Sequence, residues 1–214
     1  INRWKYMVSV RVYSSIQPNA CYSEVFQMDP EVHIAEARTE AHFAAMSRIH
    51  ALGWRAAYPD AVPARWMEEH ITDDRWVDLF RQYAVGGTYH GLLLFRGDTP
   101  VSCLTYGPAR TDAGLQAGSV CRFHSENYQG WGELISVYTH PEETGKGYGS
   151  LLVEEALNRM RRDGFRHVYV FVLRENAGAR RFYARHGFAW DGTHEDIPFP
   201  PDTICVDLRY VSAL

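Results

Sequence analysis

The sequence predicts an α/β fold built around a mixed sheet, and three observations lead to this prediction. The chain has 214 residues, of which 46% are hydrophobic, which is enough for one sizeable core. Runs of β-branched and aromatic residues alternate along the chain with segments of helical periodicity. These segments follow one another as a strand, two helices, three strands, a helix, a strand, a helix and two strands, an order typical of an α/β domain.

Local patterns predict each element in turn. A strand follows Pro30, and a helix begins near Pro63, because proline is well tolerated in the first turn of a helix. A turn begins at Gly97 between two apolar runs, and Gly164 ends a helix. In chain order the predicted elements are a strand at 32–38, helices at 39–57 and 63–83, two strands within 90–107, a loop at 109–130, a strand at 132–140, a helix at 145–163, a strand at 167–173, a helix at 177–186 and strands at 187–192 and 203–211.

The chain is predicted to consist of an N-terminal extension, residues 1–29, and one domain, residues 30–214. Alternating valines within residues 8–12 predict a short strand in the extension. Arg11 and several serines interrupt its apolar part, which argues against a signal peptide. An extra strand, a dimer arm and a misplaced start of the reading frame are all open as explanations of the extension.

Composition excludes several classes of function. The net charge of −4 and the pI of about 6.2 do not fit a general nucleic-acid binder, and no apolar run reaches the length of a membrane span. The cysteines, Cys21, Cys103, Cys121 and Cys205, have no CxxC spacing, so we expect reduced thiols in a cytoplasmic protein. The ten histidines form no HExxH pattern, and we expect no metal.

A glycine-rich turn precedes the helix at 145–163. The first turn of a helix has unpaired N–H groups and partial positive charge, which favour a bound anion. Gly145, Gly147 and Gly149 would let a pyrophosphate approach the backbone, Lys146 would add a charge and Ser150 a hydroxyl. The spacing fits neither the P-loop nor the dinucleotide fingerprint. From the glycines alone, a plain turn between a strand and a helix is an equal alternative.

The turn resembles the acyl-CoA site of the GNAT superfamily of N-acetyltransferases. The superfamily signature Arg/Gln-x-x-Gly-x-Gly/Ala corresponds here to Thr144-Gly145-Lys146-Gly147-Tyr148-Gly149. Both required glycines match, whereas Thr144 replaces the usual Arg or Gln, for which Lys146 is the candidate substitute.

A second stretch, residues 174–188, resembles the helix of the same superfamily with the pattern Asn-x-x-Ala-x-x-Phe-Tyr-x-x-x-Gly-Phe. The matching residues are Asn176, Ala179, Phe182, Tyr183, Gly187 and Phe188. One helix and one strand separate the two motifs, as in the superfamily.

The resemblance implies a mostly antiparallel central sheet flanked by about four helices, with acetyl-CoA as co-substrate and a primary amine as acceptor. It also implies that the backbone of 137–139 and the side chain of Asn176 bind the pantetheine arm. The residues that it assigns to the cofactor are Val137, Tyr138, Thr139, Thr144, Gly145, Lys146, Gly147, Tyr148, Gly149, Ser150, Asn176 and Ala179. Dimers are common in the superfamily, so a homodimer is the oligomer to test.

The resemblance also suggests the catalytic groups. A lysine-like amine is almost fully protonated at pH 7, so the reaction needs a proton acceptor, and the leaving thiolate benefits from a donor. Tyr183 would donate to the thiolate, and Glu133, at the start of its strand, would be the base directly or through water. His140 and His124 are weaker candidates, and packing against the sheet is the alternative for Tyr183.

The acceptor is expected to meet the two helices within 39–83 and the late strands. Trp54, Tyr58, Trp66 and Trp76, with Glu68, Glu69, Asp73 and Asp74, would suit a cationic amine, although a core of aromatic residues under a solvated acidic face is the better explanation of the pattern. Residues 192–203 would border the site as a mobile loop, and Arg180 and Arg181 either reach the phosphates or lie on a solvated face. A non-catalytic acyl-CoA-binding domain and a longer acyl donor remain alternatives.

Overall fold

The structure is a computed structural model that describes residues 31–110, 128 and 130–214. Its strands are β1 (Val32–Glu36), β2 (His90–Arg96), β3 (Thr99–Pro108), β4 (Trp131–Thr139), β5 (His167–Leu173), β6 (Ala189–Phe199) and β7 (Thr203–Ala213). Its helices are α1 (Glu40–Ala57), α2 (Ala64–His70), α3 (Val77–Gly86), α4 (Tyr148–Arg162) and α5 (Ala177–Arg185), with a short 3-10 helix η2 (Pro141–Glu143) before α4.

The strands form one mixed sheet in the order β1-β2-β3-β4-β5-β7-β6. All neighbouring strands are antiparallel except β4 and β5, which confirms the predicted fold class. The parallel pair follows from the connection through α4, because parallel neighbours need a crossover. The sheet therefore consists of two antiparallel parts joined at β4 and β5.

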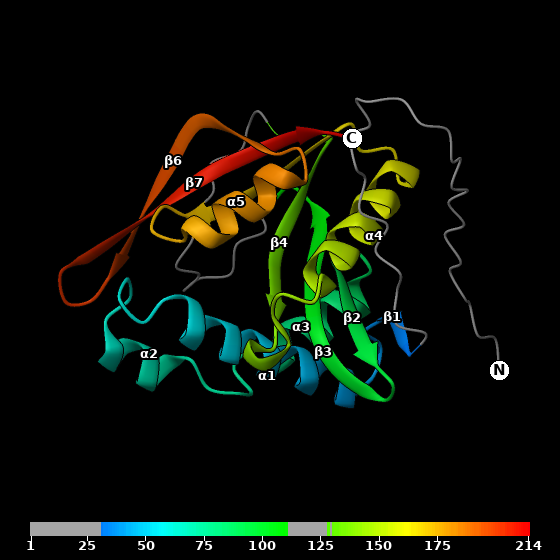
Figure 1. Ribbon diagram of the computed structural model, residues 1–214, viewed down its shortest axis with the longest axis horizontal. Coiled ribbons are helices and arrows are strands. Elements are labelled where there is room, and N and C mark those ends of the chain that lie inside the picture. Colours follow the sequence, from blue (N-terminus) through cyan, green and yellow to red (C-terminus); the bar gives the residue numbers. More distant parts are fainter. Residues whose placement is uncertain (1–30, 111–127, 129) are drawn as a thin grey trace, which may run out of the picture.

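Helices cover both faces of the sheet. Leu92 and Leu94 of β2 pack in the core cluster that includes α4, whereas Leu93 between them packs against α1 and α3. This alternation is expected for a strand that is buried on both faces. Figure 1 shows α4 along β3 and β4, and the β6–β7 hairpin extending toward α2. The hairpin and α2 share a third apolar cluster, which contains Met67, Ile197 and Phe199.

The predicted helix over 63–83 is wrong, because the chain forms two helices there. The first helix, α2, ends at His70, and the buried Ile71 has a non-helical backbone. The Thr72 hydroxyl then donates to the Asp74 carboxylate at 2.7 Å, a local bond that competes with helix formation. The Trp76 N–H donates to Ser47 Oγ at 3.0 Å and ties the start of α3 to α1.

The late strand predicted at 187–192 is longer than expected, and the mobile loop predicted at 192–203 is wrong for most of its length. The strand β6 continues to Phe199 and pairs with β7 on both sides of an irregularity between Trp190 and His194. Ile197 and Phe199 are buried. Burial of these side chains against α1 and α2 explains why the segment is a strand rather than a loop.

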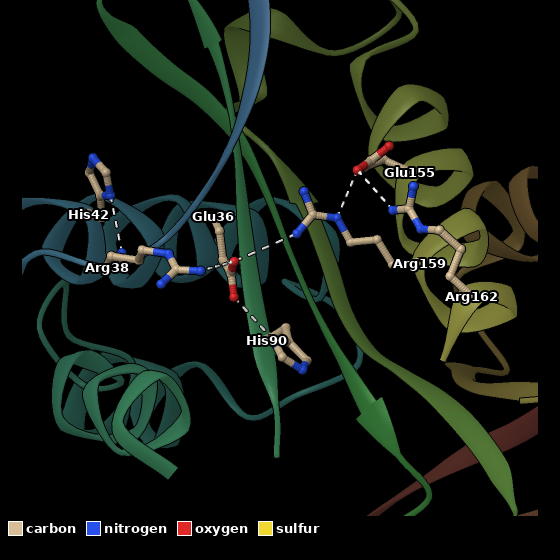
Figure 2. A network of polar contacts seen from close by, with 7 residues as sticks. All are labelled: Glu36, Arg38, His42, His90, Glu155, Arg159 and Arg162. Carbon is tan, nitrogen blue, oxygen red and sulfur yellow. Dashed lines mark hydrogen bonds and ion pairs between the residues drawn. The ribbon is translucent and has the colours of Figure 1, made fainter. Parts of the chain in front are cut away.

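A polar network ties β1, at the edge of the sheet, to α4 (Figure 2). The Glu36 carboxylate accepts hydrogen bonds from Arg38 at 2.7 Å and from His90 at 3.1 Å, and it lies 3.8 Å from the Arg159 guanidinium. Arg159 in turn donates to Glu155, one turn earlier in α4, at 2.7 Å. The network anchors a five-residue strand that, among the described strands, has a neighbour on one side only.

Several predictions concern residues outside the described part. They are the N-terminal extension, its strand at 8–12, most of the loop at 109–130, and His124. In the described part, Cys103 and Cys205 are buried free thiols, and no three His, Cys, Asp or Glu side chains gather to hold a metal ion. Among the described helices, none has the length and apolar character that a membrane crossing requires.

Candidate active site

The site lies where β4 and β5 stop pairing. Only Trp131–Glu133 of β4 pair with His167–Tyr169 of β5. Beyond Glu133, β4 pairs on one edge with β3 but has no described strand on its other edge. A bulge contributes to the divergence: Leu134 and Ser136 face successive residues of β3, and Ile135 between them has no partner there. The backbone of 137–139, predicted to bind the pantetheine arm, therefore borders a gap in the sheet.

The glycine turn joins this edge to α4. Gly145 and Gly147 have φ of +80° and +83°, in the left-handed region that favours glycine. Gly147 is the N-cap of α4, and no side chain of the described residues caps the helix. The first N–H groups of α4 are therefore without intrahelical partners and without a side-chain acceptor. Thr144 donates its hydroxyl to the Pro141 carbonyl at 2.9 Å, so it stabilises the turn locally.

The charged and polar side chains of the turn already have partners within the protein. Lys146 Nζ lies 2.7 Å from Glu143, whose carboxylate also binds Arg96 at 2.8 Å. The hydrogen bond from Lys146 is the main cause that holds the pKa of Glu143 below its usual range; burial opposes it, and the charge of Arg96 adds to the lowering. Ser150 Oγ lies 3.0 Å from His186 Nε2 of α5's C-terminal cap. An anion at this turn would therefore meet mainly backbone N–H groups.

The second motif forms α5, and its Asn176 is the helix cap. Asn176 Oδ1 accepts a hydrogen bond from the Ala179 N–H at 2.9 Å. This contact uses the side-chain oxygen and leaves the amide N–H₂ available to a ligand. Arg180 donates to the Tyr210 hydroxyl at 3.1 Å and to the Arg174 carbonyl at 3.2 Å, whereas Arg181 is exposed.

Three tyrosines meet at the gap, from α1's C-terminal cap, β4 and α5. The hydroxyls of Tyr58 and Tyr138 are 3.4 Å apart. Burial, and then the neighbouring Tyr58, raises the pKa of Tyr183, which is 6% exposed. Burial also raises the pKa of Tyr138, with further contributions from Tyr58, Tyr183 and Asp207. These effects keep the hydroxyls of Tyr138 and Tyr183 protonated at neutral pH.

A glycine in α1 allows the Tyr138 ring to lie close to that helix. A Cβ on Gly53 would be 2.2 Å from Cδ1 of Tyr138, so no other residue fits without moving the ring. Glycine in the middle of a helix costs about 1 kcal/mol relative to alanine. Here the glycine that carries this cost leaves room for the ring of Tyr138 at the gap.

Glu133 is buried, and both oxygens of its carboxylate have hydrogen-bond partners. Its side chain is 1% exposed, and Arg110 donates to it from Nη2 at 2.5 Å, from Nε at 3.0 Å and from the backbone N–H at 3.1 Å. Tyr169 donates its hydroxyl at 3.0 Å. Both oxygens thus accept hydrogen bonds from within the protein, an arrangement typical of a buried ion pair.

Asp207 of β7 is a carboxylate at the site that the sequence reasoning missed. Burial, and then the nearby Glu175, raises the pKa of Asp207 to about 7, while Arg110 opposes the rise. Its sequence signal is an acid among apolar residues in the strand at 203–211. That signal has no value until the strand order is known, because only pairing with β5 brings β7 next to the gap.

The aromatic residues expected to meet the acceptor pack mostly against one another. The ring centroids of Trp54 and Tyr58 are 5.0 Å apart, and those of Trp66 and Phe199 are 4.8 Å apart. The four expected acids, Glu68, Glu69, Asp73 and Asp74, are exposed, and two of them form ion pairs with Arg65 and Arg55. The distribution matches the alternative of a core under a solvated face, with Tyr58 reaching the gap.

Two further places remain, namely His140, between β4 and the glycine turn, and a pocket that is separate from the site. His140 caps η2, where its Nδ1 accepts from the Glu142 N–H at 3.3 Å. A pocket of about 360 Å³ lies between α1 and α2, lined by Arg55, Pro59, Ala64, Met67, Glu68 and Ile71. None of the residues assigned to the cofactor or to catalysis lines it.

Comparison with known proteins identifies both the family and the fold. Residues 53–188 match the model of a family described as acetyltransferase (GNAT) family. The comparison with curated proteins found no match. The matched range includes the gap, the glycine turn and α5.

Solved structures share the fold at low sequence identity. The PaiA N-acetyltransferase from Thermoplasma acidophilum, solved with coenzyme A, is 17% identical, with a TM-score of 0.58 over 84% of this chain and 99% of that one. The candidate acetyltransferase YncA from Salmonella typhimurium, solved with acetyl-CoA, is 18% identical, with a TM-score of 0.63 over 86% and 94%. A ribosomal-protein-alanine N-acetyltransferase from Brucella melitensis is 20% identical, with a TM-score of 0.63 over 85% and 99%.

Proposed function

The chain belongs to the acetyltransferase (GNAT) family, and we propose that it transfers the acetyl group of acetyl-CoA directly to a primary amine. The observation that supports this most is the combination of an uncapped helix start with an adjoining unpaired strand edge. The first suits a diphosphate and the second suits an amide-containing chain, and coenzyme A contains both.

The residues present fit acetyl-CoA. The N–H groups at the start of α4 would hold the diphosphate, and Gly145 and Gly147 leave room for it. The edge of β4 at 137–139 and the amide of Asn176 would hold the pantetheine arm. Acetyl-CoA supplies the activated acetyl group as a thioester, and no covalent bond to the protein is required.

Tyr183 is proposed as the proton donor to the departing sulfur. During transfer a C–N bond forms, the C–S bond breaks and the sulfur takes a proton. A buried phenol whose pKa is raised by its surroundings keeps that proton until the thiolate forms. Tyr58 and Tyr138 lie beside it and would position the reacting groups.

The resemblance predicts that Glu133 is the base, directly or through water. Its carboxylate would have to give up hydrogen bonds from Arg110 or Tyr169 before it accepted a proton from an amine. Breaking a buried charged hydrogen bond is costly. The contacts of Glu133 therefore favour a role in holding Arg110 and Tyr169 in place.

Calorimetry and a thiol-release assay test the proposal. Acetyl-CoA is expected to bind, and a panel of primary amines (cadaverine, lysine amide, tyramine and a peptide with an N-terminal alanine) is expected to include at least one that releases free CoA thiol. The alanine peptide is included because of the activity named for the Brucella melitensis protein. Absence of acetyl-CoA binding would refute the proposal.

A non-catalytic acyl-CoA-binding domain is the second candidate. It would use the helix start and the edge of β4 but would not need a protonated phenol at the gap. Tight acetyl-CoA binding without thiol release across the panel would favour it.

The domain boundary at residue 30 and a homodimer are further proposals, which limited proteolysis and light scattering would test.

A further inference from the structure

Asp207 lies beside the end of β5, on the face of the sheet that bears Tyr138. It is directly opposite Leu173, the last residue of β5, and on its other side it is opposite Glu195 of β6. Directly opposed residues of antiparallel strands project from the same face. Leu173 packs with α1 and α2, and Tyr138 packs with α1 and α3, so Asp207 shares their face.

The gap separates Asp207 from Tyr138 at the same level of the sheet. Glu133 of β4 pairs with Tyr169 of β5, and Leu173 is four residues further along. Four residues and one bulge residue beyond Glu133, β4 has reached Tyr138. The influence of Asp207 on Tyr138 agrees with this placement, since Asp207 contributes to the raised pKa of Tyr138 after burial and the neighbouring phenols.

The carboxylate of Asp207 is available, unlike that of Glu133. Among the described residues, no hydrogen bond or ion pair to the Asp207 side chain is found, and the side chain is half-buried. The charged and titratable groups that face it are Glu175, Arg110, Tyr138, Cys205 and Glu195. Of these, Arg110 is held by Glu133 and Glu175 by Arg174.

We infer that Asp207 binds the ammonium group of the acceptor and takes its proton, which makes Asp207, rather than Glu133, the base of the reaction. The inference rests on the proposed function. In this step an N–H bond of the ammonium breaks, an O–H bond forms on Asp207, and the electron pair stays on nitrogen for attack on the acetyl carbon. Asp207 then releases the proton to water. The proton that the nitrogen loses after attack replaces the one that Tyr183 gives to sulfur.

The surroundings of Asp207 suit this role. A base works best when its pKa is near the working pH, and burial followed by the charge of Glu175 brings the pKa of Asp207 to about 7. An ordinary aspartate, with a pKa near 3.9, would be too weak a base to take a proton from an alkylammonium. The same burial lowers the stability of the folded protein when Asp207 is charged, and such a loss of stability is common at functional sites.

The first test compares Asp207→Asn with Asp196→Asn, the same change at an exposed position of β6. With the best amine of the panel, Asp207→Asn is expected to lower kcat/KM by about 10²-fold or more, with the acetyl-CoA Kd unchanged. Asp196→Asn is expected to leave both quantities unchanged. Full activity of Asp207→Asn in a protein whose wild type is active would overturn the inference and leave the proposed function intact.

The pH profile gives a second test. Wild-type kcat/KM is expected to fall as the pH drops below about 7, because Asp207 becomes protonated. Glu175→Gln removes a charge that raises the pKa of Asp207, so the acidic limb should move to lower pH while the plateau stays the same. A limb that does not move with Glu175→Gln, or that persists in Asp207→Asn, would contradict the assignment.

A readout independent of activity guards against a folding defect. Because the pKa of Asp207 is raised in the folded state, protons bind the folded protein more tightly between about pH 4 and pH 7, and stability falls as pH rises there. Asp207→Asn should therefore have a higher Tm than wild type at pH 8 and lose that advantage at pH 4. A lower Tm at pH 8 would mean that the carboxylate is structural. Failure of wild type to bind acetyl-CoA would instead refute the proposed function.

Discussion

Tyr183 is the residue at which the chemistry is most directly testable. Tyr183→Phe removes the hydroxyl and keeps the buried ring in the core cluster. We expect a loss of roughly 10²-fold in kcat with an unchanged Kd for acetyl-CoA, because the phenol acts only when the thiolate forms. Stopped assays with calorimetry in parallel would measure both.

A matched control is available on β3. Tyr106 is equally buried in the same core cluster but neighbours Arg159 rather than the gap. Tyr106→Phe is expected to retain activity. If both variants lost activity equally, the effect would reflect packing, and the role of Tyr183 as proton donor would fail.

His50 has no role in the proposed reaction, but its surroundings predict how the stability of the protein changes in acid. Its ring lies 4.1 Å from Trp76 and 4.4 Å from Tyr138, and its Nδ1 has no hydrogen-bond partner among the described residues. Burial first, and then the charge of Arg75, lowers the pKa of His50 to about 3. The folded protein therefore holds this histidine neutral.

Because His50 is neutral in the folded protein, acid should destabilise the folded state. Between pH 6.5 and about 3 the unfolded chain binds a proton at His50 and the folded protein does not, so stability falls as pH falls. His50→Phe keeps a ring in the stack and removes that dependence. The free energy of unfolding of the variant minus that of wild type should grow as pH falls from 7 to 4 in urea titrations. A constant difference would contradict the prediction.

At the scale of the element, two glycines at the start of α4 allow the effect of a left-handed backbone to be distinguished from the effect of an added methyl group. Gly147 has φ of +83°, so Gly147→Ala introduces strain of about 1–2 kcal/mol. A Cβ on Gly149 would be 3.5 Å from Phe182, an ordinary contact, so Gly149→Ala should be close to neutral for stability. Both changes add one methyl group within the same turn.

The CoA affinities of these two variants should differ in the same way as their stabilities. We expect Gly147→Ala to weaken CoA binding about tenfold or more, because relief of the strain would turn the N–H groups away from the diphosphate. Gly149→Ala should bind nearly as wild type, in line with the Gly/Ala alternative in the superfamily signature. Calorimetry with CoA measures both variants, and equal affinities would argue against a diphosphate at this turn.

At the scale of the whole molecule, the β6–β7 hairpin joins the late strands to the first helices (Figure 1). Phe199 is 4% exposed, contacts Trp66, and packs in the cluster shared with α1 and α2. Phe199→Ala should lower the free energy of unfolding by about 3–5 kcal/mol, as for other buried phenylalanines.

Ile204 gives the contrast for the same hairpin. It is 62% exposed, so Ile204→Ala should change stability by no more than about 0.5 kcal/mol. Chemical denaturation followed by tryptophan fluorescence would compare the two variants. Equal small effects would mean that the hairpin does not dock on α2 in solution.

The sequence by itself determined most elements and indicated the glycine turn that we propose as the cofactor site. Helix and strand periodicities, the stop at Gly164, and the two superfamily motifs depend on residues that are close in the chain. Such local signals survive without knowledge of the fold. The prediction failed at 63–83 and at 192–203, where buried side chains of distant elements decided the local conformation.

Only the tertiary structure decided which carboxylate is available at the gap. Glu133 lies in the strand where the motif placed it, but its partner Arg110 comes from another part of the chain and occupies its oxygens. Asp207 reaches the gap only through the order β4-β5-β7 and the register of each pair. Strand order, register and a single bulge are set by contacts far apart in sequence, and therefore no local pattern encodes them.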